Sequence, residues 1–173
     1  MNEILLTRRA ILSAAALTIA GAHRLVAATL PAPVENPILS VAGNIAATNT
    51  EGVALFDRPM LEKLGMVSFE TTTPWFNGVV KFEGVPMTKL LAEVGAKGDR
   101  LVVVALNDYK SEIPIEDFER YGVIMALKRD GGYMPVRDKG PLFIVYPFDS
   151  KPELKSQKFY SRSVWQVKAI EIR

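Results

Sequence analysis

The sequence contains no cysteine, and His23 is its only histidine. Sites for zinc, copper, haem and iron–sulfur clusters normally take their ligands from these two residue types. Beyond residue 23 the chain therefore lacks such ligands, and it also lacks a histidine that could activate a serine or cysteine nucleophile. Without disulfides, the stability of the protein has to come from a packed hydrophobic core.

The sequence also has little net charge, +2 over 173 residues. Arg8, Arg9 and Arg24, set against Glu3, account for this excess, so the rest of the chain carries equal numbers of acidic and basic side chains. A neutral domain lacks the electrostatic attraction on which binding to nucleic acids or anionic membrane surfaces depends. We therefore expect no nucleic-acid partner.

The first 28 residues are typical of a twin-arginine signal peptide. Arg8 and Arg9 precede an apolar run, residues 10–22, that is too short to span a bilayer as a helix. Val26-Ala27-Ala28 provides small residues ahead of a cleavage site, and three prolines in the next nine residues indicate an extended linker. The predicted signal peptide, linker and globular domain cover residues 1–28, 29–37 and 38–173.

This division predicts a bacterial protein that is exported to the periplasm and does not insert into the membrane after the signal is removed. The twin-arginine route carries folded proteins, often with a cofactor already inserted, which favours a bound cofactor. The alternative is that the N-terminal segment stays in place as an amphipathic or anchoring helix.

Short apolar runs alternate with short helical patterns along the predicted domain, which favours an α+β fold with a mixed β-sheet core and short flanking helices. Asn77-Gly78 predicts a tight turn, and Ser150 and Glu153 have the spacing of a capping box that opens a helix. In the last predicted strand, the alternation of apolar and polar residues is interrupted at Ala169-Ile170, which predicts a bulge. The predicted strands are residues 38–45, 67–73, 79–82, 101–106, 123–127, 142–146 and 165–172, and the clearest helices are 57–65, 86–95 and 114–121.

Several short motifs follow one another over the last ninety or so residues. They are Phe82-Glu83-Gly84-Val85-Pro86, Asn107-Asp108-Tyr109, Asp130-Gly131-Gly132, Gly140-Pro141-Leu142 and Ile170-Glu171-Ile172. In order and spacing they resemble the molybdopterin-binding domain of the sulfite oxidase family. The resemblance implies a sheet core whose loops surround a pterin, and a molybdenum oxidoreductase that moves an oxygen atom or electrons.

The sequence departs from this family at two positions. The family holds its metal with the pterin dithiolene and one cysteine, which should fall within residues 71–75, where the chain has Thr-Thr-Thr-Pro-Trp. A hydroxyl replaces a thiolate poorly, because the thiolate is softer and forms more easily. Many members also have arginine where this chain has Phe143. The sequence therefore predicts no catalytic residue and no protein ligand to a metal.

Two basic segments are candidates for holding the phosphate of a pterin. Arg137 and Lys139 lie in a glycine-containing loop ahead of a buried strand, where cationic side chains and backbone N–H groups can bind a phosphate. Arg162 and Ser163 offer guanidinium and hydroxyl donors before the last strand, where the family has basic residues. In both cases the alternative is an ordinary segment without a ligand.

Two further segments are candidates for contact with the pterin ring. Asn107, Asp108 and Tyr109 follow a buried strand, a position where binding sites often form, although a simple turn also uses such residues. Trp75 can form an aromatic wall over a flat ligand, and the alternative is that it covers the edge of the core.

Three function classes remain open. The first is a molybdopterin-binding redox protein without the cysteine. The second is a cofactor-free descendant of that fold, which binds a small molecule or a membrane-bound redox or sensor protein; the missing thiol favours it. The third, least favoured, is a hydrolase that uses carboxylates such as Glu112, Glu116, Asp117 and Glu119.

Overall fold

The computed structural model describes residues 28–173, which form two five-stranded sheets, a two-stranded ribbon and short helices. The strands are β1 (Ala28–Thr29), β2 (Leu39–Gly43), β3 (Ala47–Thr48), β4 (Ala54–Phe56), β5 (Val67–Thr73), β6 (Phe76–Pro86), β7 (Arg100–Ala105), β8 (Lys110–Pro114), β9 (Ile124–Arg129), β10 (Gly132–Tyr133), β11 (Phe143–Val145) and β12 (Val167–Ile172). The helices are α1 (Arg58–Lys63), α2 (Met87–Glu93), α3 (Glu116–Tyr121) and α4 (Gln157–Arg162), and the 3₁₀ turns are η1 (Val136–Asp138), η2 (Phe148–Ser150) and η3 (Pro152–Leu154).

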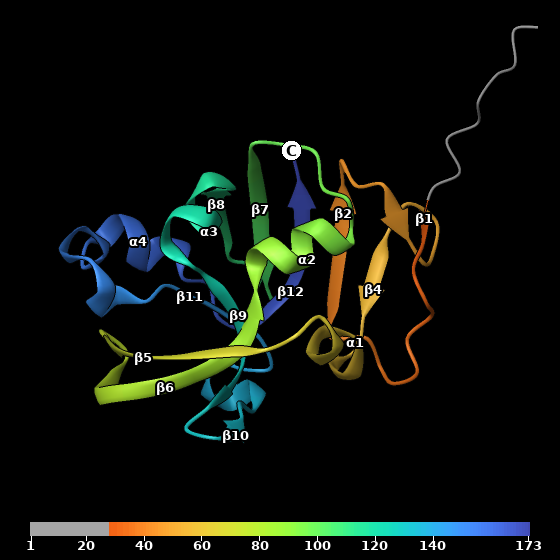
Figure 1. Cartoon of the computed structure of the whole chain (residues 1–173). Helices are drawn as coiled ribbons and strands as arrows, with labels where there is room; N and C mark the ends of the chain where they lie inside the picture. The colour runs from red at the N-terminus through yellow and green to blue at the C-terminus, as the bar shows by residue number, and fades with distance from the viewer. Residues whose placement is uncertain (1–27) are drawn as a thin grey trace, which may run out of the picture.

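The first sheet has the order β4-β2-β12-β7-β8, and the second has the order β10-β9-β6-β5 with β11 also paired to β9. The C-terminal strand β12 runs parallel to β2 and antiparallel to β7, so the first sheet is mixed. In Figure 1 the strands of the first sheet stand upright and the β5–β6 hairpin lies crosswise below them. The predicted α+β fold with a mixed sheet core is confirmed.

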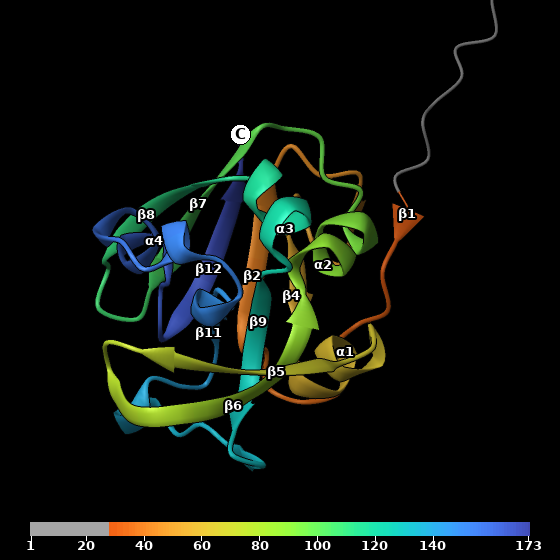
Figure 2. The same ribbon diagram turned by 60° about the vertical axis from the view of Figure 1, so that its left-hand side comes forward.

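One hydrophobic core joins the two sheets. Its largest fully buried side chains are aromatic and come mainly from the second sheet and the turns that follow it. Helices α2 and α3 pack against each other, and they lie together in both Figure 1 and Figure 2. Among residues 28–173, no helix has the length and apolar character needed to cross a membrane. The largest buried aromatic residues are Phe56, Phe82, Phe118, Phe143, Tyr146 and Phe148.

Asp57 fixes the beginning of α1 and also binds the segment that precedes β2. One carboxylate oxygen accepts a hydrogen bond from Met60 N at 2.9 Å, and the other accepts from Val34 N and Glu35 N at 2.7 and 2.8 Å. Burial favours the protonated acid, but the backbone N–H donors outweigh it and hold the pKa of Asp57 below its ordinary value. Residues 34 and 35 are therefore attached to the domain. The predicted signal peptide lies outside the described residues except for Ala28, and the boundaries at residues 28 and 37 stay predictions.

The hairpin between β5 and β6 turns earlier than the Asn-Gly signal predicts. Pro74 and Trp75 form the turn, and Thr73 pairs directly with Phe76. Asn77-Gly78 instead supplies the two extra residues of a bulge within β6, where Gly78 adopts a φ of +75° that favours glycine. Proline presets the backbone for the first central position of a turn, which explains why Pro74 decides the location. This shift places Trp75 at the tip of the hairpin.

Two smaller predictions also need correction. The Ser150–Glu153 spacing gives no α-helix, because Ser150 belongs to η2 and the following turn η3 ends when Lys155 leaves the helical region with a ψ of 59°. The helix begins later, at Gln157. The bulge in β12 is present, but the register shift lies between Val167 and Ala169, just before the predicted position.

Candidate functional site

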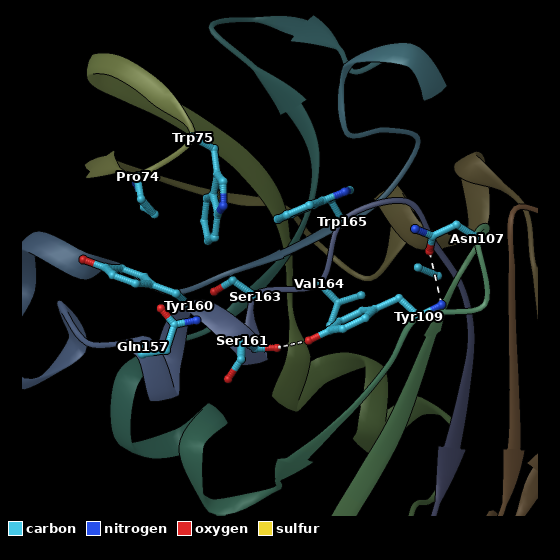
Figure 3. A pocket seen from close by; sticks show the side chains of 11 residues that line it. Pro74, Trp75, Asn107, Tyr109, Gln157, Tyr160, Ser161, Ser163, Val164 and Trp165 are labelled. Carbon is cyan, nitrogen blue, oxygen red and sulfur yellow. Dashed lines mark hydrogen bonds between the residues drawn. The ribbon is translucent and has the colours of Figure 1, made fainter.

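A cavity of about 380 Å³ opens at the edge of the first sheet where β7 ends and β12 begins. We call it the aromatic cavity. Four segments surround it: the β5–β6 turn, the β7–β8 turn, helix α4 and the residues between α4 and β12. Its volume falls within the range of small-molecule sites. The lining residues, most of them drawn in Figure 3, are Pro74, Trp75, Ala105, Asn107, Tyr109, Gln157, Tyr160, Ser161, Ser163, Val164 and Trp165.

Trp75 is the centre of the aromatic wall. Its ring packs edge-on against Trp165 and Tyr160, which also line the cavity, with centroids 5.4 and 6.0 Å away. It packs in the same way against Phe143 and Phe148 of the core, at 5.5 and 5.9 Å. Edge-to-face packing at these distances is favourable. The core therefore holds the wall in position before any ligand arrives.

Hydrogen bonds join the β7–β8 turn and the start of β8 to α4 along one side of the cavity. The Tyr109 hydroxyl and the Ser111 hydroxyl both donate to the carbonyl oxygen of Ser161, at 3.3 and 2.9 Å. Within the turn, Asn107 Oδ1 accepts from Tyr109 N at 3.2 Å, and directly after α4 the buried Ser163 donates to Phe159 O at 3.0 Å. Figure 3 shows Trp75 and Trp165 along one side of the cavity, with Tyr160, Ser161 and Tyr109 along the other.

Within residues 28–173, no charged side chain lines the aromatic cavity. The Nζ of Lys139 lies 4.1 Å from the centroid of the Trp165 ring. Burial, followed by the charge of Arg129, lowers the pKa of Lys139, while Asp138 opposes the shift. The cavity is thus lined by neutral and aromatic side chains, and the Lys139 ammonium contacts the Trp165 ring.

The cavity brings together four of the predicted site residues, Trp75, Asn107, Tyr109 and Ser163. Lys139 contacts it through Trp165. The remaining three lie apart from it: Asp108 is exposed and pairs with Lys168 at 2.7 Å, Arg137 is exposed in η1, and Arg162 forms a 2.6 Å ion pair with the buried Asp117.

Sequence reasoning missed Trp165, Tyr160 and Gln157 as lining residues. Trp165 was predicted to begin a strand, whereas it lies in the segment before β12, with only an isolated bridge to Phe143. Tyr160 and Gln157 fall on α4, which the sequence did not predict at that position. The sequence did offer one signal for this part of the site: Tyr160 and Trp165 flank a short stretch that contains two serines.

In the segment that should carry the metal-binding cysteine, all three threonine hydroxyl groups already take part in hydrogen bonds. Thr71 Oγ1 accepts from Asp149 N at 3.0 Å, and Thr72 Oγ1 donates to Asp149 Oδ1 at 2.7 Å. Thr73 Oγ1 accepts from the backbone N–H groups of Trp75 and Phe76. Lys155 and Thr72 together hold the pKa of Asp149 far below its ordinary value. These hydroxyl groups stabilise the hairpin and its contact with η2, and a neutral hydroxyl is a poor replacement for a thiolate ligand.

Four basic side chains of the surrounding elements are held in ion pairs, whereas Arg137 and Lys139, the predicted phosphate ligands, form none within residues 28–173. Arg129 forms a bidentate pair with Asp138, and Lys155 pairs with Asp149 at 2.6 Å, in addition to the Arg162 and Lys168 pairs above. Among residues 28–173 there is no cluster of three carboxylate, histidine or cysteine side chains that could hold a metal ion. Without a thiolate or a carboxylate cluster, this donor set does not fit a protein-bound molybdenum centre.

A family model described as the oxidoreductase molybdopterin binding domain matches residues 59–150, which is more than half of the chain. No curated protein matches the chain. The matched segment contains Trp75, Asn107 and Tyr109, whereas α4 and Trp165 lie beyond it. The aromatic cavity is therefore built partly from the matched domain and partly from the C-terminal segment that follows.

Proposed function

The chain belongs to the oxidoreductase molybdopterin-binding domain family, and from this premise we propose that it is an exported member that binds a planar organic molecule instead of a metal-bearing cofactor. The cofactor-free binding module is thus favoured over the molybdenum enzyme. The observation that carries the proposal is the aromatic cavity itself: a neutral space of about 380 Å³ with Trp75, Tyr160 and Trp165 in its walls.

The chemistry of the lining residues supports this assignment. Aromatic walls bind flat rings through stacking and through removal of apolar surface from water. A pterin with a phosphate and a metal needs a thiolate and cations, whereas the side chains that line the cavity are neutral, and the threonine hydroxyls of residues 71–73 are already used in hydrogen bonds. A neutral ring system matches what these residues offer.

Export and partners are part of the same proposal. The signal-like residues 1–28 support a periplasmic location reached by the twin-arginine route. In that compartment the binding module would contact a membrane-bound redox or sensor protein, which distinguishes the ligand-bound form from the ligand-free form. The balanced charge of residues 29–173 supports the absence of a nucleic-acid partner.

The two tryptophans make the proposal easy to test, because the chain has only two and both line the cavity. We would titrate the purified protein with 2-acetylnaphthalene and follow tryptophan emission, corrected for absorption by the probe. The expected result is saturable quenching with one probe per chain, which weakens in Trp75→Phe and Trp165→Phe. Emission that changes only in proportion to probe concentration would contradict the proposal.

A further inference from the structure

The end of the aromatic cavity nearest Asn107 contains two side-chain hydrogen-bond donors, one from Asn107 and one from Trp165. Asn107 Oδ1 accepts from Tyr109 N, a backbone donor, which fixes the orientation of the amide and leaves Nδ2 as a pure donor. The indole Nε1 of Trp165 also makes no hydrogen bond within residues 28–173. Figure 3 shows these two nitrogen atoms on the sides of their residues that face each other.

The backbone holds the two donors close to one another. Leu106 N, next to Asn107, donates to the carbonyl of Gln166, next to Trp165, at 2.8 Å. Gln166 N in turn donates to Lys139 O at 3.1 Å. Main-chain hydrogen bonds thus connect the end of β7, the segment before β12 and the loop that contains Lys139. These main-chain bonds therefore fix the spacing of the two backbone segments that carry the donors.

The indole N–H is accessible, as a ligand-binding donor has to be. Trp165 is partly buried, yet within residues 28–173 no buried side-chain nitrogen or oxygen lacks a partner, so its Nε1 must be open to solvent. The Lys139 ammonium, 4.1 Å from the ring centroid of Trp165, adds positive charge beside the same indole. Both effects favour an electron-rich acceptor there.

We propose that Asn107 Nδ2 and Trp165 Nε1 together bind a ring-borne oxygen atom of the ligand, a carbonyl or carboxylate oxygen, while the ring stacks in the aromatic cavity. This inference rests on the proposed function and narrows it to planar aromatic compounds that carry such an oxygen. A carbonyl oxygen has two lone pairs and can accept from both donors at once. A purely hydrocarbon ring leaves both donors without a partner when it excludes water from them.

The test compares two probes of the same shape. In 2-acetylnaphthalene the side group ends in C=O, and in 2-isopropenylnaphthalene the oxygen is replaced by CH₂; 2-naphthoate tests the carboxylate. We expect the ketone to bind roughly tenfold more tightly than the alkene, the equivalent of one to two net hydrogen bonds. The ¹⁵N-labelled protein has only two indole N–H signals, because it has two tryptophans. The Trp165 signal should move with the ketone and not with the alkene.

Matched variants assign the effect to the two donors. Asn107→Asp keeps the oxygen that accepts from Tyr109 N and replaces only the free NH₂, so the tenfold preference for the ketone should fall to about twofold or less. Trp165→Phe keeps an aromatic wall without the N–H and should reduce the preference similarly. Asn36→Asp makes the same chemical change on the exposed segment before β2, outside the lining of the cavity, and should leave the preference at tenfold.

The outcomes separate this inference from the proposed function. Equal affinity for ketone and alkene, with both probes shifting the tryptophan signals, would overturn the oxygen site and leave the aromatic cavity as a binding site. Failure of all three probes to bind would overturn both. A larger preference for 2-naphthoate than for the ketone would identify the ligand oxygen as a carboxylate, and the reverse would identify it as a carbonyl.

Discussion

The Arg162–Asp117 ion pair provides a quantitative test of whether Arg162 belongs to the fold or to a ligand site. Arg162 Nη1 lies 2.6 Å from Asp117 Oδ2, and the two side chains are 17% and 6% exposed. The Tyr146 hydroxyl donates to the same oxygen at 2.8 Å. Burial, together with the charge of Asp117, raises the pKa of Tyr146 well above its usual value, so this hydroxyl remains a donor.

The perturbation is Arg162→Leu, which removes the cation and keeps an apolar stem. Breaking a buried pair from one side costs about 3–5 kcal/mol, because the remaining charge stays buried without compensation. Tyr146 still donates one hydrogen bond to Asp117, so we expect the lower end, a loss of about 3 kcal/mol in the free energy of unfolding. The double variant Asp117→Asn/Arg162→Leu removes both charges and should lose about 2 kcal/mol less than the sum of the single variants.

Urea unfolding followed by circular dichroism gives these free energies without relying on the tryptophans in the cavity. Arg162→Lys serves as a control that keeps the charge but changes the donor geometry, and it should lose less than Arg162→Leu. The reasoning is refuted if Arg162→Leu loses less than about 1 kcal/mol while 2-acetylnaphthalene no longer binds, because Arg162 would then serve a ligand and not the core.

Three other perturbations test the hairpin, the wall and the contact between β6 and β9. Lys155 and then Thr72 hold the pKa of Asp149 below its ordinary value, so its stabilising contribution is full above about pH 4 and declines as the pH falls below that. Asp149→Asn should therefore flatten the acid side of the curve of melting temperature against pH, and parallel curves would contradict this. Phe143→Arg introduces the residue typical of the family and places an unpaired charge at a fully buried position, so the free energy of unfolding should fall by more than about 4 kcal/mol. Phe143→Leu is the milder control. A soluble and stable Arg variant would contradict the packing described here. In Gly84→Ala the new Cβ would lie 2.1 Å from Met125 O on the neighbouring strand, so a loss of about 2–3 kcal/mol is expected. Gly132→Ala meets only Arg129 O at 3.8 Å and should cost less, and equal losses would be evidence against a close approach of β6 and β9.

Local signals predicted the elements whose causes lie within a few residues. Asp57 was expected to cap a helix, and its carboxylate accepts from Met60 N. Apolar spacing correctly predicted α2, and the continuous apolar runs correctly predicted β7 and β9. The hairpin turn was misplaced because two turn signals stand side by side, and proline at residue 74 outweighed Asn77-Gly78.

The candidate site was predictable only in part, because its geometry depends on contacts between distant segments. Trp75, Asn107 and Tyr109 stood out as an aromatic residue and as polar residues at a strand end. The cavity also needs α4 and Trp165, which reach it through the pairing of β12 with β7. Likewise, nothing local indicates that Arg162 finds a partner 45 residues earlier in Asp117.

The central claim is that this family member binds an organic ring without molybdenum, and analysis of the native protein tests it most directly. The protein would be purified from the periplasm of its own host, grown with molybdate, and analysed for molybdenum and for extracted pterin. The account predicts folded protein with neither group in stoichiometric amount. Molybdenum and pterin at about one each per chain would contradict it and point to a metal site without a thiolate.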